Sequence, residues 1–421
     1  MTRIPEESWF HRAKLGIFLH WGIYSVKGVP ESWAMYYHGQ DVPWPTLSRE
    51  DYFAQYDGFT AARYDPAAWA ALFKEAGARY AVLTTKHHDG VAMWDTALSD
   101  DSIVKKSPVG RDVIAPYCEA MRDAGLHVGL YFSHADWSHP DFPSLHAPRR
   151  DNALFTSPMN VRPDDQMEDR AGWARFLAFR NGQVRELMER FHPELLWFDG
   201  DFPHGPAVFE MRELRDEIKA RDPQVIVNSR LGAWGDYETP EQALPVRPPE
   251  ETWELCTTVN RSWDYAPQDN DYKPIERIVR IFTECVGHGG NLLLGVGPDA
   301  EGRFDPRAVE ILKGLGAWIR PNAEAIYDTR RGLPDGLFNG ASTLSADKRT
   351  LYLIAYDRAA NYLLVKGLAS KPTRVTRLDT GAELSTRGDL GVLWIDLTAA
   401  GTLNPNATVF KLEFEEPLCL K

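Results

Sequence analysis

Acidic side chains that follow apolar segments are the first residues of this chain that could do chemistry. Asp199 comes directly after the run LLWF and precedes a glycine, so its carboxylate is expected at the end of a buried strand. Asp201, two residues further on, competes for the same role. Cleavage of a glycosidic bond with retention needs two carboxyl groups, one ionised and one protonated. Asp199 is the candidate for the ionised member.

The second carboxyl group has several candidates that the residues alone do not separate. Three of them share the segment GDYETPEQALP, and a fourth lies in the segment TWELC. These candidates are Asp236, Glu238, Glu241 and Glu254. A loop glutamate is usually only solvated, and a strand glutamate can equally be a buried hydrogen-bond acceptor.

Imidazoles form a second group of candidate functional residues. His20 ends IFLHWG, His87 and His88 lie in KHHDG, and His134 follows GLYFS. A metal site is one interpretation. Successive residues of a strand point to opposite faces, so His87 and His88 are not expected to bind one ion together. Hydrogen bonding to sugar hydroxyls suits them better, because an imidazole is both donor and acceptor.

Short strand-like segments must position these residues, and segments of helical period lie between them. The seven strand candidates span residues 15–22, 79–90, 127–134, 194–201, 224–230, 252–259 and 291–297. This alternation predicts a parallel sheet. Polar or aromatic residues at nearly every strand end favour a TIM barrel over a doubly wound open sheet. With seven strands instead of eight, either the barrel is imperfect or one strand is irregular.

The pattern changes after a long helical stretch at residues 307–329. Five short alternating runs follow without helices between them: TLYLIAY, YLLVKGL, TRVTRLDT, VLWIDL and TVFKLEFEE. Strands in direct succession predict an antiparallel β-sandwich. The expected division is a catalytic (β/α) barrel over residues 1–332 and a C-terminal β-sandwich over residues 333–421.

The composition argues against several classes of partner. A net charge of −13 without a basic run disfavours nucleic acid and anionic membranes. The four cysteines form no CxxC motif, so reduced structural thiols are expected. The chain begins without a charged and then apolar leader and has no run of 18 apolar residues, which predicts a cytoplasmic location.

With these motifs in place, the sequence resembles the α-L-fucosidases of glycoside hydrolase family 29. The likeness rests on HWG, KHHDG, WFDG and the NSR…TPE loop in this order, and it covers about residues 8–330. It implies a barrel followed by a β-sandwich and a retaining exo-hydrolase that removes terminal α-L-fucosyl residues. Fucosylated oligosaccharides or glycoconjugates are the implied substrates. Neither a metal nor an organic cofactor is needed, and a homo-oligomer is compatible with the family.

The resemblance also implies roles for individual residues. The WFDG aspartate falls on Asp199 as nucleophile, and the TPE glutamate falls on Glu241 as general acid/base. Many relatives have a Glu-Trp pair after the first strand, whereas this chain reads Glu31-Ser32-Trp33, which leaves open whether Glu31 or Ser32 replaces the family glutamate. The residues expected to contact the sugar are His20, Trp33, His87, His88, Tyr131, Trp197, Arg230 and Trp263.

Three other functions fit parts of the pattern. A barrel glycosidase could act on a related sugar such as an α-galactoside, because L-fucose and D-galactose have related hydroxyl configurations. The histidines could serve a metal-dependent hydrolase, which chelators would inhibit. A sugar-binding protein without catalysis is the third alternative, and any turnover excludes it.

Overall fold

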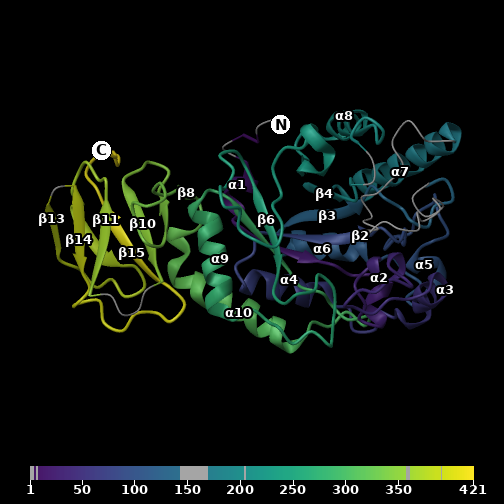
Figure 1. Ribbon diagram of the computed structural model, residues 1–421, viewed down its shortest axis with the longest axis horizontal. Coiled ribbons are helices and arrows are strands. Elements are labelled where there is room, and N and C mark those ends of the chain that lie inside the picture. The colour runs from purple at the N-terminus through teal and green to yellow at the C-terminus, as the bar shows by residue number, and fades with distance from the viewer. Residues whose placement is uncertain (1–3, 6–7, 143–168, 203–204, 357–360, 390) are drawn as a thin grey trace.

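Two regions of different architecture follow one another along the chain. The computed structural model describes residues 4–5, 8–142, 169–202, 205–356, 361–389 and 391–421. Helices surround a sheet in the N-terminal region, whereas the C-terminal region, coloured yellow-green to yellow, consists of strands and loops (Figure 1).

Seven parallel strands form the sheet of the N-terminal region, in the order β5-β4-β3-β2-β1-β7-β6. Each of the seven predicted strands is present, and each is shorter than its predicted segment. The strands are β1 (Leu15–Leu19), β2 (Tyr80–Lys86), β3 (His127–Ser133), β4 (Leu195–Asp199), β5 (Ile226–Val227), β6 (Glu254–Thr258) and β7 (Asn291–Gly295).

An irregular segment, residues 236–242, joins the two edge strands β5 and β6. On the β5 side, the amide of Asp236 donates to the carbonyl oxygen of Val227 over 2.8 Å. On the β6 side, the amide of Gln242 donates to the carbonyl oxygen of Cys256 over 2.8 Å. We call residues 236–242 the closing segment, because it takes the place of the eighth barrel strand. The barrel therefore contains the irregular strand that the sequence pattern left open.

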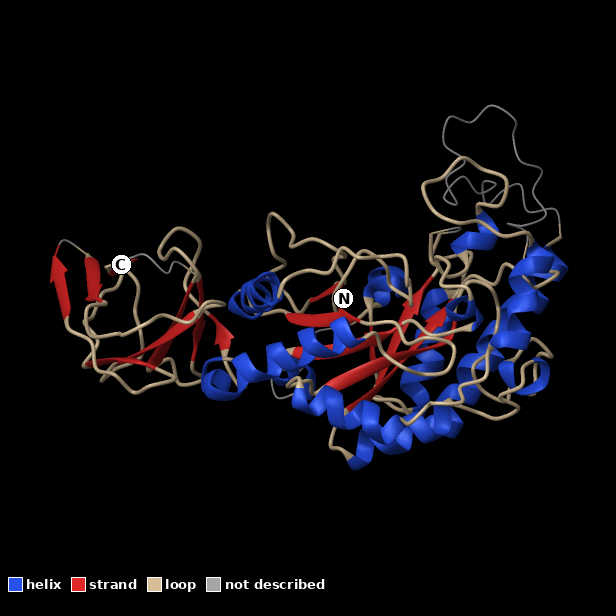
Figure 2. Cartoon of the chain, turned by 90° about the horizontal axis from the view of Figure 1, so that it is seen from below, coloured by secondary structure: helices blue, strands red, loops and turns tan. Residues whose placement is uncertain are grey.

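Helices cover the outside of the barrel (Figure 2). Three of them begin at an aspartate whose side chain accepts a hydrogen bond from the first turn, at Asp65, Asp169 and Asp305, which satisfies amides that have no partner within the helix. Among the described residues, no helix is both long enough and apolar enough to cross a membrane. The helices are α1 (Trp9–Ala13), α2 (Trp33–Tyr36), α3 (Arg49–Phe53), α4 (Pro66–Glu75), α5 (Ile103–Lys106), α6 (Ile114–Asp123), α7 (Arg170–Phe191), α8 (Met211–Arg221), α9 (Ile275–Gly287) and α10 (Pro306–Asn322).

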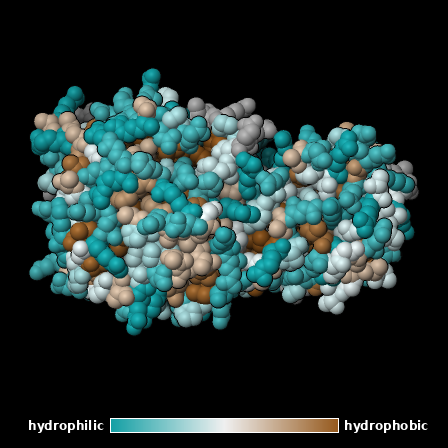
Figure 3. Space-filling model, turned by 180° about the vertical axis from the view of Figure 1, so that it is seen from behind, coloured by the Kyte–Doolittle hydropathy of each residue, from teal (hydrophilic) through white to brown (hydrophobic). Residues whose placement is uncertain are grey.

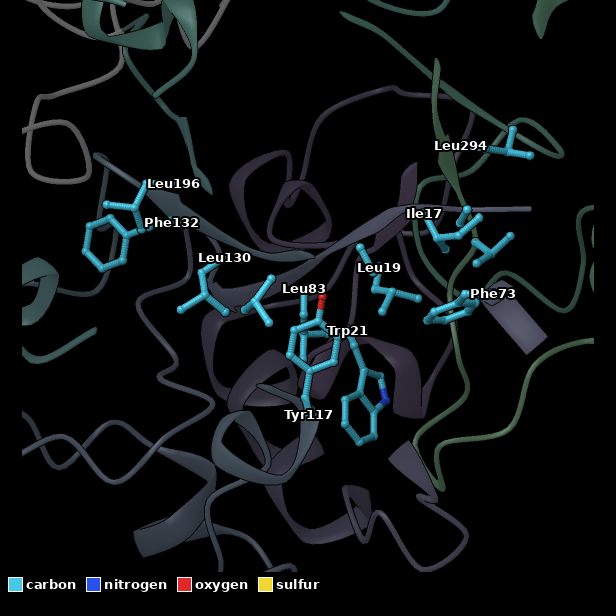
Figure 4. Packing of buried hydrophobic residues seen from close by; sticks show 14 of the residues in the cluster. Ile17, Leu19, Trp21, Phe73, Leu83, Tyr117, Leu130, Phe132, Leu196 and Leu294 are labelled. Atoms are coloured by element: carbon cyan, nitrogen blue, oxygen red, sulfur yellow. The ribbon is translucent and has the colours of Figure 1, made fainter. Parts of the chain in front are cut away.

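Alternate residues of each strand supply two separate cores. Ile17 and Leu19 of β1 point outward and pack with Phe73 of α4 between the sheet and the helices (Figure 4). Phe18, between them in the sequence, belongs instead to the cluster inside the barrel with Trp197. This alternation follows from the period of two in a strand, and it decides which side chains reach the pocket.

The C-terminal region is the predicted antiparallel β-sandwich. It contains a five-stranded sheet in the order β12-β15-β10-β9-β8 and a three-stranded sheet in the order β11-β14-β13. The five predicted strands are β10 (Thr350–Ala355), β11 (Tyr362–Lys366), β12 (Arg374–Arg377), β14 (Val392–Asp396) and β15 (Thr408–Glu413). Three strands were not predicted: β8 (Arg330–Arg331), β9 (Ala341–Leu344) and β13 (Thr386–Asp389). β8 ends just before the predicted domain boundary at residue 333. The face of the molecule that Figure 3 shows is mostly hydrophilic, with small scattered apolar areas.

Candidate active site

A pocket opens at the C-terminal ends of the barrel strands, the face where barrel enzymes place their active sites. Its volume of about 200 Å³ leaves room for one monosaccharide. The lining residues are Phe18, His20, Glu31, Trp33, His87, His88, Trp197, Asp199, Phe202, Arg230, Glu241, Cys256 and Trp263.

Asp199 ends strand β4 and projects into this pocket. The hydroxyl of Tyr131, on neighbouring β3, donates to Oδ2 of Asp199 over 2.9 Å. His88 Nε2 lies 3.8 Å from the same oxygen, and Nη1 of Arg230 lies 3.8 Å from Oδ1. Asp201 also faces Arg230, at 3.6 Å, but it does not line the pocket. The structure therefore brings Asp199, and not its neighbour, to the cavity.

Glu241 lies in the closing segment, opposite the end of β4. Nη2 of Arg230 donates to Oε2 of Glu241 over 3.0 Å, so a single guanidinium lies between Glu241 and Asp199. Partial burial and the charge of Asp199 raise the pKa of Glu241, while Arg230 opposes this rise. Because the side chain is 45% exposed, solvent weakens these effects. The two carboxyl groups therefore share one guanidinium, and the pKa of Glu241 is raised despite this ion pair.

Glu254, another candidate for the second carboxyl group, lies below the pocket in the barrel interior. Nε1 of Trp197 donates to its Oε1 over 2.9 Å, and the hydroxyl of Tyr237 donates to the same atom over 3.3 Å. The hydroxyl of Tyr80 donates to Oε2. Fully buried and held by three donors, Glu254 is a structural hydrogen-bond acceptor, one of the two interpretations of a strand glutamate.

Asp236 and Glu238, the remaining candidates, also lie outside the pocket. Asp236 is buried against α8, where Nζ of Lys219 donates to it over 2.8 Å. The amide of Glu254 donates to the carbonyl oxygen of Glu238 over 2.9 Å, so Glu238 serves the closure of the barrel through its backbone. Of the four acids, only Glu241 contributes to the pocket wall.

His87 and His88 both lie in the pocket wall, with their ring centroids 4.1 Å apart. The expectation that they point to opposite faces is wrong, because β2 ends at Lys86 and the strand alternation ends with it. Ligand atoms of His87, His88 and Asp199 lie within 4.8 Å of one another, a spacing that a metal ion could use. The two rings can therefore act on one bound group, contrary to what strand geometry predicted.

The hydrogen bonds behind the two rings indicate the tautomer of His88. The hydroxyl of Ser133 donates to a backbone carbonyl over 2.8 Å, so it accepts from Nδ1 of His88 over 2.6 Å. Ser32 accepts from the amide of Asp89 over 2.9 Å, and its Oγ lies 2.5 Å from Nδ1 of His87. Burial lowers the pKa of His88 to about 3 and that of His87 well below its usual value. His88 thus presents an acceptor at Nε2.

Of the two residues that could replace the family glutamate, Glu31 lines the pocket and Ser32 does not. The backbone of Glu31 has a φ of 25°, a strained value of the kind that clusters at functional sites. Burial raises the pKa of Glu31 to about 8, and the charges of Glu241 and Asp199 add to this rise. Behind it, Asp264 is buried, and its carboxylate oxygens have no hydrogen-bond partner among the described residues. Burial therefore favours the protonated form of Glu31, the form that can donate a hydrogen bond.

The other residues expected to contact the sugar divide into two groups. His20, Trp33, Trp197, Arg230 and Trp263 line the pocket. Tyr131 does not: its ring stacks against Trp197 with centroids 5.8 Å apart, and its hydroxyl is committed to Asp199. Tyr131 accordingly holds a pocket residue in place.

Phe18, Phe202 and Cys256 line the pocket but were not predicted. Phe18 lies two residues before His20 on β1, so the period of two of the strand could have indicated it. Cys256 follows Glu254 by two residues on β6 and could have been found in the same way. No comparable signal marks Phe202, which lies beyond the end of β4.

Comparisons with known proteins agree with this geometry. The sequence profile of the α-L-fucosidase family matches residues 2–324. An α-L-fucosidase of Branchiostoma floridae is 30% identical over 94% of this chain and 88% of its own length. Among solved structures, α-L-fucosidase isoenzyme 1 from Paenibacillus thiaminolyticus is 33% identical, with a TM-score of 0.84 over 97% of this chain and 98% of that one. The Thermotoga maritima α-fucosidase in complex with fucose is 26% identical, with a TM-score of 0.75 over 97% of both chains.

The profile covers well over half of the sequence, and the likeness to the first two enzymes extends over nearly the whole chain. The alternatives of another sugar specificity, a metal-dependent hydrolase and a protein without catalysis are not favoured by these relatives. From its pocket and its relatives together, this chain belongs to the α-L-fucosidase family of glycoside hydrolases.

Proposed function

We propose that the chain is a retaining exo-α-L-fucosidase, with Asp199 as nucleophile and Glu241 as general acid and then general base. The observation that carries this proposal is the placement of the two carboxyl groups on either side of Arg230, in a pocket with room for one sugar. Retention by double displacement needs one ionised and one protonated carboxyl group. The electrostatics of the pocket favour protonation of Glu241.

In the first step, Oδ1 or Oδ2 of Asp199 attacks the anomeric carbon of a terminal α-L-fucosyl residue. The bond to the leaving-group oxygen breaks, and Glu241 transfers its proton to that oxygen. Tyr131 and Arg230 orient the attacking carboxylate. A covalent fucosyl ester of Asp199 results.

In the second step, the ionised Glu241 takes a proton from a water molecule, whose oxygen attacks the anomeric carbon. The ester bond to Asp199 breaks, and L-fucose leaves with its original anomeric configuration. Arg230 stabilises the carboxylate form of Glu241 in this half of the cycle, which lets one residue serve as acid and as base.

Neutral donors and acceptors hold the sugar during both steps. We assign its hydroxyl groups to His20, His87 and His88, with Glu31 in the place of the family glutamate. Trp33, Trp197 and Trp263 then surround the ring and its methyl group, since they belong to the apolar part of the wall. The fucose complex of the Thermotoga maritima enzyme supports this choice of ligand. Fucosylated oligosaccharides or glycoconjugates are the proposed substrates.

Replacing the nucleophile tests the mechanism. We expect Asp199→Gly to lose about 10⁴-fold or more in kcat on 4-nitrophenyl α-L-fucoside, by analogy with the removal of other catalytic side chains. Azide should restore turnover by occupying the vacated space and should give β-L-fucosyl azide. Full activity without azide would refute the assignment of Asp199.

The stereochemistry and the sugar specificity need separate measurements. Proton NMR of the wild-type reaction should show α-L-fucose as the first product, and β-L-fucose first would mean inversion. A panel of nitrophenyl glycosides should show hydrolysis of the α-L-fucoside well above that of the α-D-galactoside. The cytoplasmic location stays a prediction from the sequence, which cell fractionation tests.

A further inference from the structure

A row of aromatic rings leads from the wall of the pocket to the surface of the molecule. Trp33 lines the pocket and stacks on Tyr37, with centroids 5.9 Å apart and planes 28° from parallel. Tyr37 lies one helical turn after Trp33 and contacts Trp44 edge to face, with centroids 5.8 Å apart. Trp44 is 39% exposed. We call Trp33, Tyr37 and Trp44 the aromatic row.

The inner end of this row is fixed by the pocket itself. The ring of Trp33 meets His88 edge to face at 5.4 Å and stacks on Phe202, another lining residue, at 5.7 Å. Tyr37 and Trp44 do not line the pocket. They therefore extend the apolar wall of the pocket outward.

A restricted backbone carries the solvent-exposed outer end of the row. Trp44 lies between Pro43 and Pro45, whose rings restrict the backbone on both sides of it. A single exposed apolar side chain needs no explanation, but Trp44 is continuous through Tyr37 with the wall of a binding pocket. Aromatic rings presented in this way are typical of ligand-binding surfaces.

We propose that Tyr37 and Trp44 bind the leaving-group saccharide of a fucosylated oligosaccharide. This inference rests on the proposed function. The pocket has room for one sugar, so the saccharide beyond the scissile bond must lie outside it, and the aromatic row is a surface that continues outward from the pocket wall. Pyranose rings present faces of C–H groups that stack on aromatic rings. Because neither residue is charged at neutral pH, a neutral saccharide is the occupant that fits them.

Two substrates with different leaving groups test this subsite. α-L-Fucosyl fluoride has a single atom as its leaving group and cannot use it. Fucosylated oligosaccharides can use the subsite. The panel consists of fucosylated lactose and N-acetylglucosamine derivatives with α-1,2, α-1,3, α-1,4 and α-1,6 linkages. We expect Tyr37→Ala and Trp44→Ala each to lower kcat/KM on the best of these oligosaccharides by about fivefold relative to fucosyl fluoride, since one lost ring contact has about this effect.

Matched variants make the result interpretable. Tyr37→Phe and Trp44→Phe keep a ring and should retain most of the oligosaccharide activity. Tyr362→Ala removes an aromatic side chain that is 45% exposed on β11 of the β-sandwich, and it should leave the ratio of the two substrates unchanged.

Five outcomes would overturn the inference. An equal loss on both substrates means that the row only supports Trp33, and no loss on either means that the row does not bind the leaving group. If Tyr37→Ala or Trp44→Ala contains more monomer than the wild type on gel filtration, and the ratio of kcat/KM on the two substrates is unchanged, a second copy of the chain covers the row. If the wild type hydrolyses fucosyl fluoride but no oligosaccharide has a higher kcat/KM than methyl α-L-fucoside, a leaving-group subsite is excluded. If the wild type does not hydrolyse fucosyl fluoride at all, the proposed function itself fails, and the subsite fails with it.

Discussion

The floor of the barrel, which is the interior below the pocket, and its mouth, which is the pocket itself, each contain a glutamate. The two glutamates differ in how many hydrogen-bond donors contact them. Glu254, at the floor, is fully buried and accepts from three side chains. Glu241, at the mouth, is 45% exposed, and among the described residues it accepts from Arg230 alone. A carboxylate saturated by fixed donors stabilises the fold, whereas one with a free oxygen can exchange a proton with a ligand.

The indole of Trp197 connects the two regions. Its Nε1 donates to Glu254 below, while its ring forms part of the pocket wall above. The floor therefore fixes the orientation of a side chain at the mouth. Changes to the floor should act on stability and on the shape of the pocket, and changes at the mouth should act on the chemistry.

The largest effect is expected at the mouth, from Glu241→Ala. Loss of the general acid should lower kcat on methyl α-L-fucoside by about 10³-fold, which is within the usual contribution of such a group. The loss on α-L-fucosyl fluoride should be much smaller, because fluoride leaves without protonation. Steady-state kinetics on both substrates measure this difference.

Glu238→Gln is the matched control for this variant. Its side chain lies three residues away in the same closing segment and does not line the pocket, so both substrates should be hydrolysed at nearly the wild-type rate. Equal losses on the two substrates in Glu241→Ala, or a large loss in Glu238→Gln, would remove the distinction between the two glutamates.

A stability effect is expected at the floor, from Glu254→Gln. The amide group would turn one acceptor into a donor facing the hydroxyl or indole donors around it, which should lower the free energy of unfolding by about 2 kcal/mol. Urea unfolding followed by tryptophan fluorescence measures this change. If the variant keeps its stability and instead loses turnover as severely as Glu241→Ala, the floor takes part in the chemistry.

A shift in the pH profile is expected from Arg230→Ala. Arg230 stabilises the ionised form of Glu241 and so lowers its pKa. Without this charge the pKa rises further, and the protonated form that acts as general acid persists to higher pH. The basic limb of the kcat/KM profile should therefore move to higher pH. If the basic limb stays in place or moves to lower pH, the ionisation of Glu241 does not determine that limb.

The smallest effect is expected from chelation. His87, His88 and Asp199 are spaced closely enough to hold a metal ion, but the proposed mechanism uses them as hydrogen-bond partners and nucleophile. Incubation with EDTA should leave kcat and KM unchanged. Loss of activity that added zinc restores would favour the metal-dependent alternative.

Strand ends and strand period explain which parts of the site could be predicted from the sequence. An apolar strand followed by Asp199 and a glycine indicated a carboxylate at the barrel mouth, and the structure places it in the pocket. The same rule failed for His87 and His88, because it was applied beyond Lys86, where β2 ends. The position of a strand end depends on the pairing of its neighbours, which the local sequence does not contain.

Glu241 could not be separated from its neighbours on the same local grounds. Its placement follows from the pairing of residues 236–242 with β5 on one side and β6 on the other, which joins the two edge strands of the sheet. The short strands β8, β9 and β13 were missed for a related reason. With two to four residues each, they are too short for an alternating pattern to appear.

The closing segment offers a practical starting point for enzyme engineering. Its backbone is bonded on both sides, through Asp236 to β5 and through Gln242 to β6, whereas Val246 in the following loop is 99% exposed. Insertions and loop grafts between residues 243 and 251 would begin two residues after Glu241 without opening the barrel. Libraries built there could alter which acceptor sugars reach the fucosyl-enzyme and so turn hydrolysis toward oligosaccharide synthesis.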